Sequence, residues 1–234
     1  MIKTLAKYIF MIKLGFKYVK KFKVTYFDPF ISLKPAYKQL SLDRQAYSNT
    51  ILEYLNIDVN LIGDIPKQDG ILYAINHRSL LDIIVMEHLF SGQDKNGTWI
   101  AKKDLFDAIY GDFFKYSGCI SVDLANGRGL LKFFKEIKKV FSKVDNFNLY
   151  IFPEGERNKD YGILEFQSGA SKIAKANKLE IVPVFINDTL ESVFKDAPYK
   201  ETKKIDVHVG SIIDHKNLEN DYITFMNNEK ASAK

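Results

Sequence analysis

Short apolar runs alternate with amphipathic stretches along most of this chain of 234 residues. The runs are rich in β-forming residues and predict buried strands at residues 57–62, 71–75, 99–101, 120–122, 149–152, 181–186 and 205–210. Apolar residues at helical spacing lie between most of them, at residues 81–90, 104–116, 129–144 and 170–177. Strands that alternate with helices predict an α/β domain with a central, mostly parallel sheet flanked by helices.

The first 26 residues show a different pattern, in which lysines alternate with large apolar residues and no acidic residue occurs. On a helix of ~100° per residue, the lysines gather in one arc and most apolar side chains occupy the other. The frequent lysines exclude a membrane-spanning helix and a secretory signal, because each needs an uninterrupted apolar stretch. We therefore predict a basic amphipathic helix that lies in the interface of an anionic membrane. The alternative is a helix that docks on its own domain and turns its basic face to solvent.

Residues 27–45 contain Pro29 and Pro35, which disfavour a continuous helix and predict a connection or a broken helix. A helical pattern resumes at Ser41. We accordingly divide the chain into an N-terminal membrane-associating helical segment, residues 1–45, and an α/β domain, residues 46–234. The chain beyond Asp214 is polar, and residues 229–234 are expected to fray.

The net charge of +5 indicates an anionic partner: nucleic acid, anionic lipid or a phosphorylated substrate. Nucleic acid is disfavoured, because the lysines mostly alternate with acids after residue 40 and no motif with aromatic platforms is present. The single cysteine, Cys119, excludes an internal disulfide and fits a reducing compartment. The four histidines lack the spacing of zinc ligands, so we expect no metal site.

The strongest candidate for chemistry lies where the predicted strand 71–75 ends. Asn76 and His77 follow the strand, and Asp82 comes in the first turn of the next predicted helix, after a Ser79 N-cap. A carboxylate at this spacing can accept a hydrogen bond from His77 Nδ1, which leaves Nε2 free to act as a base. The same Ser-x-x-Asp spacing is also a helix capping box, and that interpretation stays open.

A second corner follows the predicted strand 149–152. Pro153 ends the strand, and Gly155 after Glu154 lets the backbone approach a ligand closely. Arg157 lies just past the turn, where its planar guanidinium suits bidentate binding of phosphate or carboxylate. An ordinary β-turn with exposed charged residues is the alternative.

Together these stretches resemble the glycerolipid acyltransferase family, whose best-known members are the 1-acylglycerol-3-phosphate, or lysophosphatidic acid, acyltransferases. The resemblance rests on four blocks in the family's order: Asn76-His77-x-x-x-x-Asp82, Gly118–Asp123, Phe152-Pro-Glu-Gly-x-Arg157 and Ile181–Val184. Lys102 or Lys103 matches the family's lysine before the second block. The resemblance extends over roughly residues 50–213.

The resemblance implies transfer of a fatty acyl group from acyl-CoA or an acyl carrier protein thioester to the free hydroxyl of a lysophospholipid. With 1-acylglycerol-3-phosphate as the acceptor, the product is phosphatidic acid. His77 would be the general base and Asp82 its partner, and no cofactor is implied besides the thioester co-substrate. The expected substrate contacts are Asn76, Lys102, Lys103, Arg128, Glu154, Gly155 and Arg157, with Glu154 positioning a hydroxyl or Arg157. We expect a peripheral or monotopic protein on the cytoplasmic face of the cell membrane.

Some positions depart from the family pattern. Leu124 stands where an arginine usually follows Asp123, and Arg128 could reach the same space. Glu156 and Gln167 replace a threonine and a lysine, which makes this region less positive and leaves another lysolipid, or a lipid hydroxyl without phosphate, as an alternative acceptor. Two other functions also stay open: hydrolysis of a thioester by the same base, and a non-enzymatic basic module that binds membranes or nucleic acid.

Overall fold

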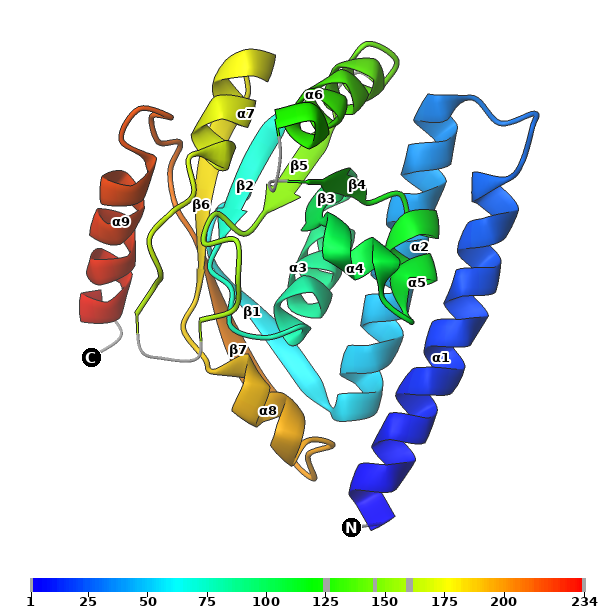
Figure 1. The fold of residues 1–234 in the computed structure, drawn as a ribbon. Coiled ribbons are helices and arrows are strands. Elements are labelled where there is room, and N and C mark those ends of the chain that lie inside the picture. Colours follow the sequence, from blue (N-terminus) through cyan, green and yellow to red (C-terminus); the bar gives the residue numbers. More distant parts are fainter. Residues whose placement is uncertain (1, 124–126, 145–146, 159–161, 233–234) are drawn as a thin grey trace.

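The computed structural model describes residues 2–123, 127–144, 147–158 and 162–232. Within these residues, seven strands form one sheet in the order β1-β7-β6-β2-β5-β3-β4 (Figure 1). Their bounds are β1 Ile57–Gly63, β2 Ile71–Ile75, β3 Gly97–Lys102, β4 Ile120–Val122, β5 Asn148–Ile151, β6 Glu180–Ile186 and β7 Lys203–Val209. Neighbouring strands are parallel except β6 and β7, which are antiparallel. The prediction of an α/β fold with a mostly parallel sheet is confirmed.

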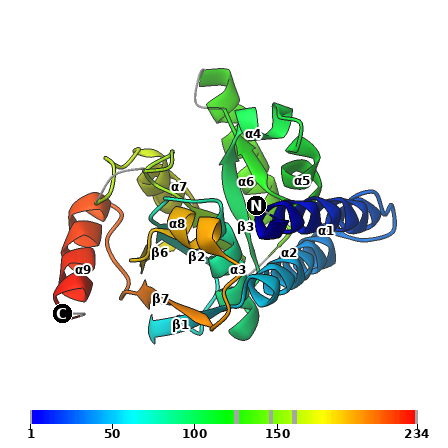
Figure 2. The ribbon, with the colours of Figure 1, turned by 90° about the horizontal axis from the view of Figure 1, so that it is seen from below.

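Helices pack against both faces of this sheet. The helices are α1 Ile2–Tyr26, α2 Leu33–Leu55, α3 Leu81–Gly92, α4 Lys103–Asp107, α5 Gly111–Tyr116, α6 Gly127–Phe141, α7 Gly169–Asn177, α8 Leu190–Asp196 and α9 Leu218–Ser232. Helices α2 and α3 cover one face and α6 and α7 the other, while α1 runs alongside α2 (Figures 1 and 2).

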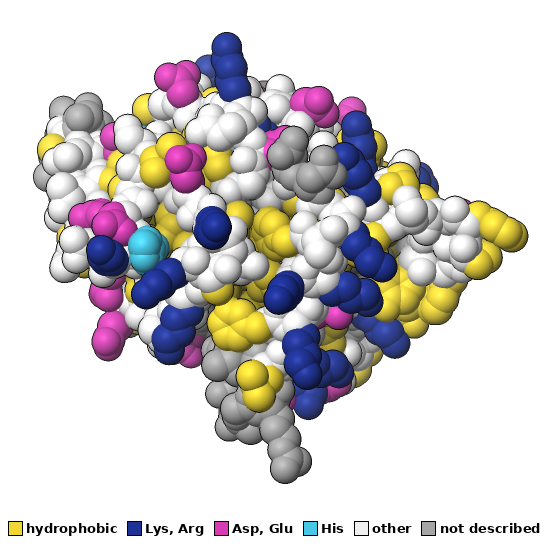
Figure 3. Space-filling view, turned by 90° about the horizontal axis from the view of Figure 1, so that it is seen from above, with side chains coloured by type: hydrophobic (Ala, Val, Ile, Leu, Met, Phe, Trp, Pro, Cys, Tyr) yellow, Lys and Arg dark blue, Asp and Glu magenta, His cyan; other side chains and the backbone are white. Residues whose placement is uncertain are grey.

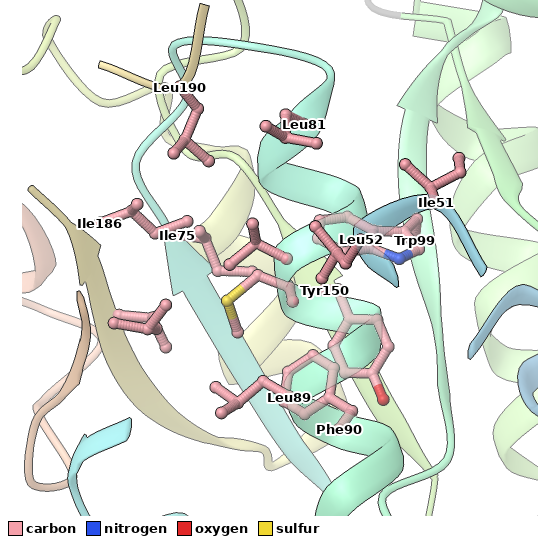
Figure 4. Packing of buried hydrophobic residues seen from close by; sticks show 14 of the residues in the cluster. Ile51, Leu52, Ile75, Leu81, Leu89, Phe90, Trp99, Tyr150, Ile186 and Leu190 are labelled. Carbon is pink, nitrogen blue, oxygen red and sulfur yellow. The ribbon is translucent and has the colours of Figure 1, made fainter. Parts of the chain in front are cut away.

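The central strand β2 is buried along its whole length, because helices cover both of its faces. Tyr73 and Ile75 point into the core beneath α2 and α3, whereas Leu72 and Ala74 point into the core beneath α6 and α7. Figure 4 shows part of the first core, where Phe90 of α3 packs beside the aromatic side chains of neighbouring strands. The sheet therefore holds the ends of β2 and its neighbours in fixed positions.

The N-terminal helix α1 is present, as predicted, but its faces are used in an unexpected way. Leu14, Tyr18 and Phe22 are buried against the rest of the protein. Lys7, which the sequence places in the basic arc, is 1% exposed, and its ammonium donates to backbone carbonyls at the end of α8. An apolar stripe faces outward and consists of Leu5, Tyr8, Ile9, Ile12 and Phe16. None of the helices in the described ranges has the length and apolar character to cross a membrane.

Helix α2 begins at Leu33, so the prediction of a connection or broken helix that lasts until Ser41 is wrong. Pro35 lies in the first turn, where a backbone N–H has no helical partner and the fixed φ of proline fits the helix. The helix continues past residue 45. The division between residues 1–45 and 46–234 thus falls within α2, and as a domain boundary it stays a prediction.

The predicted helix 104–116 is divided into α4 and α5. The division depends on Gly111, because a Cβ atom there would lie 2.0 Å from the carbonyl oxygen of Phe106. Only glycine allows this approach of two backbone segments. The turn between the two helices carries the exposed side chains of Ile109 and Tyr110.

Helices α8 and α9 were not predicted. The polar composition of α9 obscured its core-facing residues, Leu218, Tyr222 and Met226, which recur every four residues and are buried. The hydroxyl of Tyr222 also donates to the carbonyl of Val184 at 2.6 Å. Residues 229–232 belong to this helix, contrary to the expectation that residues 229–234 fray, and residues 233 and 234 lie outside the described residues.

Candidate active site

His77 lies at the corner between β2 and α3, and Asp82 lies in the first turn of α3. The distance between His77 Nδ1 and Asp82 Oδ2 is 2.9 Å. The same Oδ2 accepts the backbone N–H of Arg78 at 2.7 Å and that of Ser79 at 2.8 Å. The Asp82 side chain is only 2% exposed, so three donors hold the carboxylate in place.

These hydrogen bonds determine the tautomer of His77. A carboxylate oxygen that already accepts two backbone N–H groups accepts from Nδ1 as well, so Nδ1 carries the proton and Nε2 keeps a free lone pair. Helix α3 begins at Leu81 with Leu80 at its N-cap, so the predicted N-cap at Ser79 is wrong. The hydroxyl of Ser79 accepts the N–H of Leu81 at 3.1 Å, and Asp82 accepts the N–H of Ser79, which is only the second half of a capping box. The Asp82 carboxylate therefore binds both the backbone before α3 and the His77 ring.

The face of the His77 ring lies against Phe152, directly after β5. The two ring centroids are 3.7 Å apart and the planes differ by 9°, which is a stacked arrangement. Since β2 and β5 are parallel neighbours, both rings leave the sheet at the same edge. The sequence alone does not predict this contact, because it depends on β2 and β5 being neighbours in the sheet.

Glu154 joins the two corners through backbone hydrogen bonds. Its Oε1 accepts the N–H of His77 and its Oε2 accepts the N–H of Leu164, each at 2.7 Å. Burial raises the pKa of the Glu154 carboxyl, and the N–H donors of Leu164 and His77 oppose this rise. From the family resemblance, Glu154 is expected to position a hydroxyl or Arg157. Both carboxylate oxygens are instead engaged by the backbone, and a contact with substrate stays a prediction.

Asn76 also has a structural partner. Its side-chain amide donates to the carbonyl of Ile186 at 3.0 Å, and its Oδ1 accepts the N–H of Ile186 at 2.8 Å. This pair of bonds joins the ends of β2 and β6 next to His77. The expected contact between Asn76 and substrate stays a prediction.

A cavity of about 1630 Å³ opens beside His77. Apolar side chains from α1, α3, α4 and α5 form much of its wall, including Met11, Ile12, Ile83, Leu105, Phe113 and Phe114. Lys102, Gly155 and Arg157 line the same cavity, so three of the predicted binding residues lie together with His77. Lys172, in the first turn of α7, is a further basic residue at the cavity that the sequence analysis missed.

The turn at Gly155, directly after β5, lies close to the side chain of Lys102. Gly155 has a φ of +74°, and a Cβ atom at this position would lie 3.2 Å from Gln167 Cγ and 4.0 Å from Lys102 Cε. Gln167 and Glu156, two of the departures from the family pattern, both line the cavity. These two departures therefore lie at the same cavity as Arg157.

The remaining predicted cations are placed differently. Lys103 faces Asp123, with 3.6 Å between the ammonium and the carboxylate. Arg128 lies in α6, but its side chain is outside the described part of the structure. Lys and Arg side chains also spread across the upper face of the molecule, between areas of apolar surface (Figure 3). In the described residues, no group of three or more His, Cys, Asp and Glu side chains could hold a metal ion.

The fold and the His–Asp corner together define the class. The chain belongs to the Acyltransferase family, whose model matches residues 56–187. It is 34% identical over 134 residues to a 1-acyl-sn-glycerol-3-phosphate acyltransferase of Helicobacter pylori, which covers 56% of this chain and 54% of the relative. It is 32% identical over 119 residues to the protein of the same name from Cocos nucifera, which covers 50% of this chain and 37% of the relative. The chain thus spans about half or less of the length of these curated relatives.

A solved structure has the same fold over the whole chain. The crystal structure of the 1-acyl-sn-glycerophosphate (LPA) acyltransferase PlsC from Thermotoga maritima superposes with a TM-score of 0.70, covering 100% of this chain and 98% of that one. The sequence identity is 21%, so this likeness supports the fold alone.

Proposed function

We propose that the protein is a membrane-associated O-acyltransferase that forms phosphatidic acid from 1-acylglycerol-3-phosphate and an acyl-CoA or acyl carrier protein thioester. The observation that carries this proposal is the His77–Asp82 pair at the wall of a large apolar cavity that also holds basic side chains. A base, an apolar space and cations in one site fit a lipid with an anionic head group. The two relatives described above are both named 1-acyl-sn-glycerol-3-phosphate acyltransferase.

The proposed reaction needs a base but no covalent nucleophile, because a thioester is already activated. His77 Nε2 takes the proton of the acceptor hydroxyl as that oxygen attacks the thioester carbonyl carbon. Asp82 stabilises the imidazolium through Nδ1. The new ester forms as the carbon–sulfur bond breaks, and the proton on His77 passes to the leaving thiolate.

The fatty acyl chains would occupy the apolar part of the cavity. Its walls come from α1, α4 and α5, so the N-terminal helix would contact substrate directly. The head-group phosphate would lie at the other side, where Lys102, Arg157 and Lys172 line the cavity. Arg157 and Lys172 are exposed and free to approach a phosphate, as Arg157 makes no hydrogen bond or ion pair within the described structure.

The surface around the cavity supports contact with a membrane. Ile12, Phe16 and Ile109 line the cavity and are also exposed, so the apolar surface of α1 and the α4–α5 turn continues into the site. A lipid acceptor could enter along this surface without crossing water. Exposed lysines on α1 add attraction to anionic lipids, which face the cytoplasm in cell membranes. This supports peripheral association on the cytoplasmic face.

A lysolipid with a cationic head group is the second candidate acceptor, and Glu156 favours it. The Glu156 side chain is exposed and lines the cavity next to Arg157. A carboxylate there repels a bare phosphate and attracts an amine, while Arg157 would still bind the phosphate of such a lipid.

Thiol release tests the proposal. We expect the purified protein on anionic vesicles to release thiol from acyl-CoA or acyl carrier protein when 1-acylglycerol-3-phosphate is present, and to form phosphatidic acid. His77→Ala should lower this rate by more than about a thousandfold, because the base is lost. Release only with an amine-bearing lysolipid would select the second candidate, and free fatty acid in place of acylated lipid would indicate hydrolysis. An active His77→Ala variant would overturn the mechanism.

A further inference from the structure

The ring that stacks on His77 has a second ring behind it. Trp99 of β3 packs against Phe152 with ring centroids 5.1 Å apart and planes that differ by 28°. Trp99 is 2% exposed and also contacts Tyr150, at 5.3 Å between centroids. Figure 4 shows Trp99 and Tyr150 in the core at one side of α3. His77, Phe152 and Trp99 therefore form a row of three rings along the wall of the cavity, and Trp99 is the most deeply packed of them.

A buried ion pair fixes the Trp99 end of this row. Trp99 Nε1 donates to Glu87 Oε1 at 2.9 Å, and Arg44 Nε donates to the same oxygen at 2.6 Å. Arg44 also donates to the backbone carbonyls of Ser117 and Gly97. The side chains of Arg44 and Glu87 are 4% and 1% exposed. The indole is thus held by a network that joins α2, α3 and β3.

Stability alone does not explain this network. Removing two charges from water is costly, and apolar residues in place of a buried ion pair often give equal or greater stability. The position of the pair suggests another reason. Asp82 and Glu87 both belong to α3. Asp82 binds the edge of the His77 ring, whereas Glu87 binds Trp99, which packs against Phe152 on the face of that ring.

We propose that Trp99 is a positioning residue for His77, acting through Phe152, with Glu87 setting the orientation of the indole. The inference rests on the proposed role of His77 as the base. The bond to Asp82 fixes one edge of the imidazole but leaves the ring able to tilt about that edge. A rigid aromatic wall removes this freedom and keeps Nε2 directed at the acceptor hydroxyl, where small errors in geometry cost large factors in rate.

Kinetics of Trp99 variants test the proposal. Trp99→Leu should lower kcat by at least about tenfold and leave KM for donor and acceptor within about twofold, because the indole lines the cavity with only 2% of its surface exposed and the main loss is the geometry of His77. Trp99→Phe keeps an aromatic ring next to Phe152 but loses the N–H that binds Glu87, so it should give a kcat between those of the wild type and Trp99→Leu. If Trp99→Leu does not fold, Trp99→Phe replaces it in the comparison with the wild type. Phe185→Leu is the matched control, because Phe185 is a fully buried aromatic residue in a different core cluster. Its kcat should equal that of the wild type.

NMR of the His77 ring provides a readout that does not depend on catalysis. In the wild type, we expect one Nδ1–H tautomer and ring protons shifted upfield by the stacked Phe152. In Trp99→Leu these signals should lose the upfield shift and broaden, whereas in Phe185→Leu they should not change. The His77 signals are assigned by their loss in His77→Gln.

These measurements test the positioning role of Trp99 independently of the proposed acyl transfer. A Trp99→Leu enzyme with the kcat of the wild type overturns the positioning role, and so does a lowered kcat with unchanged His77 signals. If the His77 signals respond to Trp99→Leu while the wild type releases no thiol with any acceptor, the positioning of His77 stands and the acyltransferase proposal falls.

Discussion

At the scale of single residues, two carboxylates organise the site by binding backbone amides. Asp82 accepts the N–H groups of Arg78 and Ser79 and thereby becomes a fixed partner for His77. Glu154 accepts the N–H of His77 itself and that of Leu164. The position of His77 therefore depends on two carboxylates: Asp82 at the start of α3 and Glu154 in the turn after β5.

Glu154→Gln tests this dependence. A glutamine offers one acceptor oxygen, so one of the two backbone N–H groups at this buried site would face an NH₂ group and lose its partner. We expect the free energy of unfolding to fall by about 1–3 kcal/mol, with a lower kcat because His77 shifts. Denaturant unfolding measures the first effect and thiol release the second. Glu156→Gln, at an exposed position two residues along, is the control, and an equal stability loss in both variants would contradict the role of Glu154.

The sequence predicted some of these residues better than others. His77 and Asp82 could be paired because five residues of chain place them at one strand–helix corner, and local geometry decides their contact. The partners of Glu154, Asn76 and Trp99 could not be predicted, because each depends on which strands are neighbours in the sheet. That order follows from packing over the whole chain and not from any local pattern.

At the scale of elements, α1 is the helix whose sequence was most open to different interpretations. Its spacing predicted an apolar face and a basic face, and both exist. Packing, however, buries a third stripe that contains Leu14, Tyr18 and Phe22. Lys7 is buried as well, and its ammonium donates to the carbonyl groups at the end of α8. The sequence of α1 alone contains no sign of that contact, since α8 lies nearly at the other end of the chain.

Lys7→Met tests how α1 is held. The ammonium donates to the carbonyls of Lys195 and Ala197 at 3.1 and 3.0 Å, and to that of Phe194. Methionine keeps the length of the side chain but leaves these carbonyls without their donor, so we expect a loss of about 1–3 kcal/mol.

The loss should appear as faster hydrogen exchange in α1 and as easier proteolysis between α1 and α2. Lys13→Met, at an exposed position of the same helix, is the control and should behave as the wild type. Protection of α1 that is unchanged in Lys7→Met would show that its apolar contacts alone hold the helix.

At the scale of the whole molecule, the site is built by two parts of the chain that the sequence presents as separate. The α/β body supplies His77, Lys102 and Arg157, and α1 supplies part of the apolar wall together with Lys20 and Lys23. The sequence predicts a membrane-associating helical segment at residues 1–45 and an α/β domain at residues 46–234, with a helix docked on its own domain as the alternative for α1. The contribution of α1 to the cavity could not be predicted, because an exposed apolar stripe is equally compatible with contact to a membrane and with lining a cavity.

Gly15 provides a test of the shared cavity. It lies in the middle of α1, lines the cavity, and has no atom within 4 Å of the position that its Cβ would occupy. Leucine is a better helix former than glycine by roughly 1 kcal/mol, so Gly15→Leu should not weaken the helix. Its side chain would project into the space for the acyl chain, and we expect kcat/KM for long-chain acyl-CoA to fall by roughly tenfold or more relative to medium-chain acyl-CoA. Ala6→Leu, at an exposed position of α1, should keep the preference of the wild type. An unchanged preference in Gly15→Leu would place the acyl chain elsewhere and restrict α1 to the membrane.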